Sequence, residues 1–447
     1  MKRENLQSAT MEDLCKRFPH LGALIFANLD DQTFTKCKEA NKEISQFFNR
    51  ERFCWIRIIR HYHDNFETFQ ESWKEAINKT SVENVKQLAV AVQKFFKLHP
   101  VSSHKKVAPL HIAAEQENLP LCEHIISKLN DKNPQGNLFI INEHTLESKF
   151  RFEIWRKKSY ELVRSARVHT KTTALHIAAL KSNLELFKLI ANNIDERNPK
   201  NNEGCTPLHI AAAHGHQELF KFIVKDGEEN PRNNYGRTPL NMAARNGHID
   251  ICKFIVEKVD DKNPAQDYNL WTPLHYASSC GHFEVCKVIV ERVGNKNPAN
   301  NLGRTPLHLA AGKGNMKIPS QLVKYEEHLK IFKLISDKVR NNNPPDNDGS
   351  TPMHIAAKEG NFEVCKIIID KIKKKRKKNR QDINPFGNWL GWTPLHFAAD
   401  NGHLEICRLI IDNVENKNPQ SDEYRKTPKD VAEAKNHTEI VKLFDKM

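Results

Sequence analysis

Histidine is the residue whose spacing in this chain most readily suggests chemistry. The phrase Thr-Pro-Leu-His recurs at intervals of about 33 residues, so one imidazole returns with nearly every period. Imidazole binds metal ions and exchanges protons near neutral pH, but a zinc site needs three or four ligands that converge on one ion. One histidine per period predicts a ladder of separate side chains, each hydrogen-bonded to a neighbouring turn, and we expect neither a metal nor another cofactor. The intact phrase ends at His209, His275, His308 and His396, and its variants end at His111, His176, Asn241 and His354.

A second set of histidines follows glycine, again at the repeat period, and has the same structural interpretation. The sequence contains none of the patterns Gly-x-Ser-x-Gly, His-Glu-x-x-His or Cys-x-x-Cys, and no phosphate-binding glycine loop. We therefore expect a protein that is not an enzyme. The Gly-His pairs end at His216, His248, His282 and His403.

The period itself predicts two short helices in each unit. In one unit, Thr206 can cap a helix and Pro207 suits its first position, where no amide hydrogen is needed. Gly215 can end that helix in a left-handed conformation. A second helix with an apolar face follows, and Asn230-Pro231 stops it because proline cannot continue a helix and restricts the residue before it. A unit this small cannot bury its apolar face alone, so neighbouring units must stack.

With its repeated Thr-Pro-Leu-His, Ala-Ala and Gly-His, the chain from about residue 106 to 447 resembles an ankyrin-repeat protein. The resemblance implies an all-α solenoid of helix pairs with protruding β-turn fingers. Departures from the period predict insertions near 135–171, 317–329 and 371–389. The spacing across the first equals two periods, so a decayed repeat is the alternative there. The last unit begins Thr427-Pro428-Lys429-Asp430, where polar residues suit a solvent-facing cap.

The formal net charge of +14 is unevenly distributed. It is concentrated in segments 147–171 and 371–380, and the rest of the chain is nearly neutral. We therefore do not expect a general nucleic-acid-binding surface. The sequence contains no apolar run long enough to cross a membrane and no secretory leader, so we expect an intracellular protein, in the cytoplasm, the nucleus or both.

Half of the ten cysteines share one repeat position, which holds phenylalanine in other units. A position that accepts either residue is an apolar packing site. Equivalent cysteines on stacked helices lie about 8–10 Å apart, which is too far for a disulfide. We expect buried thiols at Cys122, Cys252, Cys286, Cys365 and Cys407.

Segment 1–60 has a different pattern, in which Phe18-Pro19-His20-Leu21 precedes Leu24-Ile25-Phe26, Leu29, Cys37 and Trp55. This spacing resembles an F-box, the helical domain that binds the linker subunit of cullin–RING ubiquitin ligases. Phe18, Leu21 and Asp31 depart from the family pattern, where Leu, Glu or Ile, and Pro are usual. The alternative is a helical cap for the repeat stack. By resemblance, the linker-binding residues are Pro19, Leu21, Leu24, Ile25 and Leu29.

Residues 61–105 are expected to connect the two parts. The spacing of Val85, Leu88, Val92 and Phe95 predicts one helix over about 82–97 with an apolar face. We expect this helix to be the first cap of the stack.

Partner-binding residues are expected where the repeat varies, because ankyrin stacks usually bind through their finger tips and first helices. Tryptophan and arginine are enriched among residues that dominate binding energy. The alternative for each tryptophan is that it packs on its own finger. The candidates are Arg237, Trp271, Arg304, Trp392, Trp389, Tyr268, Arg245, Lys313 and Lys358.

The basic run within 371–380 resembles a nuclear-import signal. Charges packed so closely repel one another and should stay solvated in an exposed loop. A plain solvated loop is one alternative, and contact with an acidic partner or an RNA backbone is another. The import candidates are Lys373, Lys374, Lys375, Arg376, Lys377 and Lys378.

Two functions fit these patterns. The first is a substrate receptor of an SCF-type ubiquitin ligase, in which the F-box-like part docks to the linker subunit and the repeat surface holds a protein target. The alternative is an ankyrin scaffold or signalling adaptor with no ubiquitin role. In both readings we expect a monomer that binds proteins, not membranes.

Overall fold

The computed structural model describes residues 80–98, 108–129, 136–139, 168–224, 230–265, 269–312, 319–374, 383–387, 391–421 and 425–447. These residues fall into an N-terminal body within Met1–Pro207 and a C-terminal body, Leu208–Met447. The F-box-like segment predicted over 1–60 lies outside the described residues, together with Pro19, Leu21, Leu24, Ile25 and Leu29.

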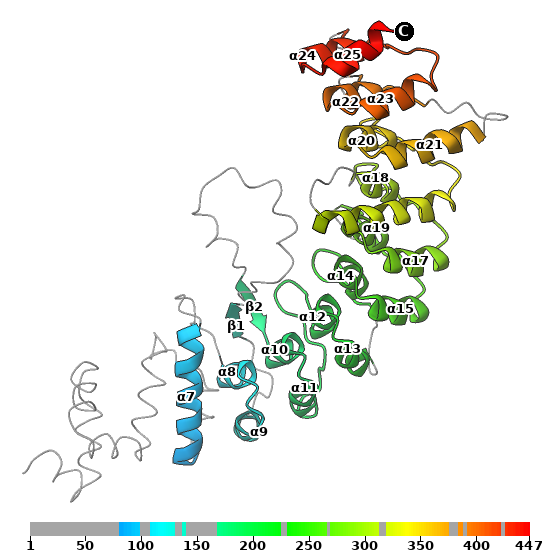
Figure 1. Cartoon of the computed structure of the whole chain (residues 1–447). Helices are drawn as coiled ribbons and strands as arrows, with labels where there is room; N and C mark the ends of the chain where they lie inside the picture. The colour runs from blue at the N-terminus through cyan, green and yellow to red at the C-terminus, as the bar shows by residue number, and fades with distance from the viewer. Residues whose placement is uncertain are drawn as a thin grey trace, which may run out of the picture. The chain divides into compact units, whose positions relative to one another are not determined.

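The described residues of the N-terminal body form a long helix, two helix pairs and a small two-stranded sheet (Figure 1). Its elements are α7 (Val82–Leu98), α8 (Pro109–Glu115), α9 (Leu119–Lys128), β1 (Gly136–Phe139), β2 (Val168–Thr172), α10 (Ala174–Lys181) and α11 (Leu184–Ala191).

The helix predicted over 82–97 is confirmed as α7, which packs against α8 and α9. Its buried side chains include Val85, Leu88, Ala89, Ala91 and Val92, which recur mainly at three- and four-residue spacing. Helix α7 therefore covers the apolar side of the first helix pair.

Strands β1 and β2 form a two-stranded antiparallel sheet that the sequence did not predict. Leu138 pairs with His169 and Phe139 with Val168, so the two ends of the segment between the first and second helix pairs lie side by side. Helix α8 packs against α10, which makes these two pairs direct neighbours.

The C-terminal body is a succession of helix pairs, which Figure 1 shows from green α12 to red α25. Its elements are α12 (Pro207–His214), α13 (Gln217–Val224), α14 (Pro239–Asn246), α15 (Ile249–Lys258), α16 (Pro273–Cys280), α17 (Phe283–Arg292), α18 (Pro306–Ala311), α19 (Pro319–Ser336), α20 (Pro352–Glu359), α21 (Phe362–Lys374), α22 (Pro394–Asp400), α23 (Leu404–Ile411), α24 (Pro428–Ala434) and α25 (Thr438–Asp445).

Each first helix begins where the sequence predicts. Thr272 has extended backbone angles and accepts the amide of His275, while the His275 side chain accepts the Thr272 amide, which completes a capping box. Gly281 then ends α16 with φ at 78°, a conformation that glycine adopts without steric cost. The same threonine and proline positions start α14, α18, α20, α22 and α24.

An apolar seam runs from α14 to α25 in the C-terminal body. First helices pack on first helices, as α14 does on α16 and α20 on α22, and second helices pack on second helices. The paired alanines of the first helices, such as Ala243 and Ala244, are fully buried, and their small size lets backbones approach closely. The repeat-position cysteines are buried and free, so this site packs as an apolar position.

Two predicted insertions contain more helix than the sequence suggested. Residues 319–336 form one continuous helix, α19, so most of the segment predicted as an insertion near 317–329 extends the second helix of its pair. The segment predicted near 371–389 begins inside α21, and Ile372 is buried there. The start of the basic run is therefore helical, whereas we expected an exposed loop.

Candidate partner-binding surface

The histidine ladder is confirmed, and each histidine reaches the turn of the next repeat. In α16, Nδ1 of His275 accepts the Thr272 amide at 3.2 Å and lies 2.9 Å from Thr272 Oγ1. Its Nε2–H donates to the carbonyl oxygen of Arg304 at 3.0 Å. The equivalent bonds join His176 to Cys205, His209 to Arg237, His308 to Ser350, His354 to Trp392 and His396 to Lys426.

Asn241 interrupts this ladder. It forms the capping box with Thr238, but its Nδ2 is buried and has no hydrogen-bond partner in the described structure. An amide is shorter than an imidazole, so it does not replace the forward bond. The contact between the α14 and α16 repeats therefore lacks one hydrogen bond that the neighbouring repeat–repeat contacts have.

A second departure from the hydrogen-bond pattern of the ladder lies in the N-terminal body. Ala108 stands where other repeats have threonine, and α8 has no side-chain cap. His111 still donates from Nε2 to the carbonyl of Thr172 at 2.7 Å, but its buried Nδ1 is left without a partner among the described residues.

Three of the histidines that follow glycine, His248, His282 and His403, bond in the opposite direction, to the preceding repeat. His248 donates to the carbonyl of Ala213 at 2.9 Å and His282 to that of Arg245 at 3.0 Å. Each ring also packs on the glycine of the preceding repeat, and a Cβ on Gly247 would lie only 2.7 Å from Nδ1 of His282. The equivalent bond joins His403 to Lys358, and His437, which follows Asn436 instead of glycine, forms the same bond to Asp400.

His328 takes the same role, which the sequence reasoning missed. It follows no glycine, yet it donates to the Ser279 carbonyl at 3.3 Å and packs on Gly281. The signal was present, since His328 precedes Phe332 by four residues just as His216 precedes Phe220.

Burial favours the neutral form of three ladder histidines. It lowers the pKa of His275, His308 and His354 to about 4 in each case, because charging a buried imidazole loses hydration. A neutral ring can accept at Nδ1 and donate at Nε2, which is the pattern observed. Both ring nitrogens of these histidines already form hydrogen bonds within the repeats, so the side chains offer no reacting group.

The asparagine of Asn-Pro also has a role beyond stopping a helix. Oδ1 of Asn263 accepts the Leu274 amide at 3.1 Å and Oδ1 of Asn297 accepts the Leu307 amide at 3.1 Å. Each asparagine therefore satisfies an amide in the first turn of the next first helix. The same bond forms at Asn230, Asn343, Asn384 and Asn418.

We call the turn before each threonine a finger. A polar side chain at its base closes it: Oδ1 of Asn300 accepts the amides of Leu302 and Arg304, both at 2.9 Å. Asn201 and Asn233 close their fingers in the same way. In finger 346–350 the closing residue is Asp346, which accepts the amides of Asp348 and Ser350.

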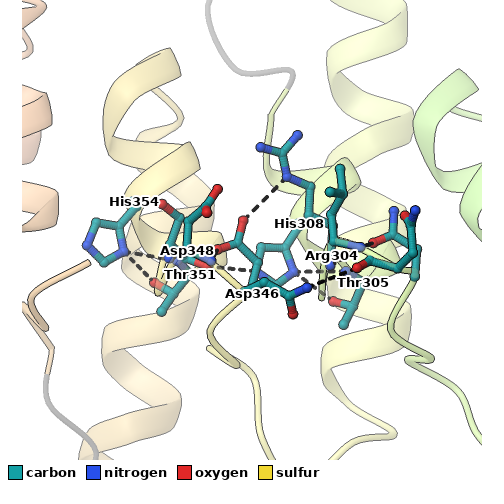
Figure 2. A network of polar contacts seen from close by, with 12 residues as sticks. Arg304, Thr305, His308, Asp346, Asp348, Thr351 and His354 are labelled. Atoms are coloured by element: carbon teal, nitrogen blue, oxygen red, sulfur yellow. Dashed lines mark hydrogen bonds and ion pairs between the residues drawn. The ribbon is translucent and has the colours of Figure 1, made fainter. Parts of the chain in front are cut away.

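Asp346 differs from the asparagines because its second oxygen bonds to another repeat. Oδ2 accepts the Nε–H of Arg304 at 3.4 Å, and the aspartate side chain is 1 % exposed while that of Arg304 is 47 % exposed. Figure 2 shows the terminal nitrogens of Arg304 pointing away from this network, which also contains His308 and His354. The ion pair therefore fixes the base of an arginine whose head is accessible.

The tryptophan candidates pack against their own repeats without being fully buried. The Trp271 ring lies 5.9 Å from the His275 ring and 5.1 Å from Tyr276. The Trp392 ring lies 5.9 Å from His396 and 5.2 Å from Phe397. Both remain partly exposed, so each is held in place yet accessible.

Three exposed apolar finger residues were missed by sequence reasoning. Tyr235 is 37 % exposed, Leu270 is 44 % exposed and Leu302 is 53 % exposed. They lie on consecutive fingers. Tyr235 is two residues before Arg237, Leu270 is directly before Trp271, and Leu302 is two residues before Arg304. A single exposed apolar residue is ordinary, but their recurrence on consecutive fingers makes these three residues candidates for partner contact.

The remaining candidates divide between described and undescribed positions. Arg245 lies at the end of α14, where its carbonyl accepts from His282, and Lys358 is exposed near the end of α20. Lys373 and Lys374 are exposed in the last turn of α21. Tyr268, Lys313, Lys375, Arg376, Lys377, Lys378 and Trp389 lie outside the described residues.

Within the part of the chain that the structure describes, no cluster of three or more histidine, cysteine or carboxylate side chains could hold a metal ion. None of the helices described is long and apolar enough to cross a membrane.

The comparisons with known proteins agree with the geometry. A family model for ankyrin repeats, described as three copies, matches residues 157–234, 226–300, 293–382 and 376–446, which together cover more than half of the chain. The search of curated proteins found no match.

Proposed function

The chain belongs to the ankyrin-repeat family, and on that premise we propose that it is a protein-binding adaptor whose fingers hold a protein partner. The observation that carries the proposal is the run of exposed or partly exposed apolar and cationic side chains on fingers 233–237, 269–271 and 300–304. Such residues supply most of the energy in protein interfaces.

The scaffold beneath these fingers supports a binding role. Its buried polar groups bond across the repeats, so the fingers are presented on a rigid frame. A preorganised surface loses less conformational entropy when a partner binds.

This proposal can be tested by affinity capture with the full chain and a Trp271→Ala/Leu302→Ala variant. We expect the variant to lose specific protein partners that the unchanged chain retains. A Lys253→Ala/Lys287→Ala variant, which alters two exposed positions on the second helices α15 and α17, is the matched control. Identical capture by all three proteins would contradict a finger-based binding surface.

We further propose that the adaptor serves an SCF-type ubiquitin ligase. The support is the F-box-like spacing of Pro19, Leu21, Leu24, Ile25 and Leu29 in the sequence. In this function the N-terminal segment docks to the ligase linker subunit, and the repeats bring target lysines close to the ubiquitin-conjugating enzyme. Proximity alone then accelerates transfer, without a catalytic group from this chain.

Co-precipitation of the linker subunit distinguishes the ligase adaptor from an ankyrin scaffold. The full chain is expected to capture the subunit, and a chain without residues 1–60 is expected to lose it. Circular dichroism melting of both proteins checks that the repeats remain folded. Capture that survives the deletion would rule out the F-box assignment and favour the scaffold.

A further inference from the structure

We propose that fingers 233–237, 269–271 and 300–304 bind an extended acidic segment of a partner protein, in which two carboxylates flank an apolar side chain. This inference rests on the proposed protein-binding function and names the chemistry of its partner. We call these three turns the Arg-Trp-Arg surface, after Arg237, Trp271 and Arg304.

The three name-giving residues occupy the same position in consecutive repeats. Each directly precedes the capping threonine of its repeat, which is Thr238, Thr272 or Thr305. Packed helices lie about 8–10 Å apart, so equivalent residues of adjacent repeats are separated by a similar distance. The surface therefore presents a cation, an apolar ring and a second cation at regular intervals.

Both arginines have fixed backbones. The Arg237 amide donates to Asn233 Oδ1 at 2.9 Å, and its carbonyl accepts from His209 at 3.1 Å. The Arg304 amide donates to Asn300 at 2.9 Å, and its carbonyl accepts from His275 at 3.0 Å. Each residue is thus held through its amide and its carbonyl.

The fingers are also tied to one another. Nη1 of Arg232 donates to the Gly236 carbonyl at 3.2 Å and to the Ala265 carbonyl at 2.6 Å, which joins one finger to the base of the next. The Asn301 amide donates to the Asn269 carbonyl at 3.2 Å, which joins the second finger to the third. The spacing of the surface is therefore set before a partner arrives.

The side chains point to an anionic partner. The Arg237 guanidinium lies 5.8 Å above the Tyr235 ring, and the Arg304 guanidinium is anchored at Nε by Asp346, which leaves its terminal nitrogens accessible. No carboxylate is present among the described residues of these three fingers. Arginine heads held in this way suit bidentate contacts with carboxylates.

Asp348 marks where the surface ends. It is exposed on finger 346–350, directly after the Arg304 finger. A carboxylate there repels an acidic partner, so an acidic segment is confined to the fingers before it.

The spacing predicts the pattern of the partner. An extended chain advances about 3.3 Å per residue, so neighbouring fingers about 8–10 Å apart correspond to about three residues. The expected pattern is an acidic residue, two of any type, an apolar residue, two of any type and a second acidic residue. The apolar side chain would lie against Trp271, Leu270 and Leu302, which are all partly or well exposed.

Selection of randomised peptides on the full chain tests this proposal. Enriched peptides are expected to share the acidic–apolar–acidic pattern, and an Arg237→Glu/Arg304→Glu variant is expected to bind them at least about tenfold more weakly. The matched control reverses two exposed charges elsewhere, as Lys253→Glu/Lys287→Glu, and should bind like the unchanged chain.

Two further measurements distinguish lost charge pairing from weaker binding caused by misfolding of the variant. A peptide with lysines in place of the two acids should bind the arginine-reversed chain and not the unchanged one. Circular dichroism should show the same helix content in all variants. Rescue by the lysine peptide would establish direct charge pairing.

Three outcomes would overturn the inference. One is a selection that enriches no peptide, and another is enrichment without acidic residues. The third is a set of peptides that bind equally to the unchanged and arginine-reversed chains. Peptides that fail to bind the Trp271→Ala/Leu302→Ala variant but bind the arginine-reversed chain normally would overturn the acidic partner and leave the proposed function standing. Peptides that bind every finger variant as well as they bind the unchanged chain would overturn both the acidic partner and the finger-based function.

Discussion

Oδ2 of Asp346 accepts the Nε–H of Arg304 across a repeat boundary, at 3.4 Å, while its Oδ1 closes its own finger. One carboxylate therefore both shapes a turn and fixes the base of an arginine on the preceding finger. At Asn201, Asn233 and Asn300 an asparagine performs the first task. The two tasks can be separated by a single substitution.

Asp346→Asn is expected to preserve the finger and release the arginine. The amide oxygen can still accept the amides of Asp348 and Ser350, as Asn300 does in its own finger. Because Arg304 is half exposed, the lost ion pair should lower the free energy of unfolding by no more than about 1 kcal/mol. The affinity for the selected acidic peptides should fall severalfold, measured by fluorescence polarisation. A large loss of stability with unchanged affinity would show that Asp346 serves the fold alone.

Asn241→His is expected to stabilise the chain. The substituted imidazole would extend the ladder toward the next finger, and it would remove the buried Nδ2 that has no partner in the described structure. One added hydrogen bond should raise the free energy of unfolding by about 1 kcal/mol, measured by urea denaturation. The reverse change, His308→Asn, removes an observed forward bond to Ser350 and should destabilise by a similar amount. If both changes are neutral, the forward bonds do not couple the repeats.

Much of this fold could be predicted from the sequence because the residues of the repeat phrase determine the local structure around them. Threonine, proline and histidine at fixed spacing define a helix start, and the ladder follows from one histidine per period. The hairpin of β1 and β2 could not be predicted, since its strands are short and separated by almost thirty residues. Helix α19 lacks Gly-His at its start, and only the spacing of His328 and Phe332 indicated its register.

The partner-binding residues were only partly predictable for a different reason. Tryptophan and arginine are conspicuous at finger positions, but a leucine in a polar turn has no distinguishing sequence signal. Leu270 and Leu302 became candidates once their exposure was known. An aromatic pair did offer a signal, because Trp271 and Trp392 are each followed five residues later by an aromatic residue that they contact.

Ala108→Thr is expected to stabilise the N-terminal body. The new hydroxyl can cap α8 and give the buried Nδ1 of His111 the partner that it lacks among the described residues. A threonine cap is typically worth about 1 kcal/mol. Hydrogen exchange of the α8 amides should slow accordingly. Ala108→Val has a similar shape without the hydroxyl, so equal protection by valine would attribute the effect to packing and contradict capping.

The stability of the repeats is expected to fall in mild acid. His275, His308 and His354 have a folded-state pKa of about 4, below the ordinary value of 6.5, so the unfolded chain binds more protons between these two values. The free energy of unfolding should be highest above pH 6.5, decline by up to about 1.4 kcal/mol per pH unit for each histidine, and level off below about pH 4. Urea denaturation across this range measures the slope. His354→Asn cannot titrate and should flatten it, while an unchanged slope would mean that other groups cause the acid sensitivity.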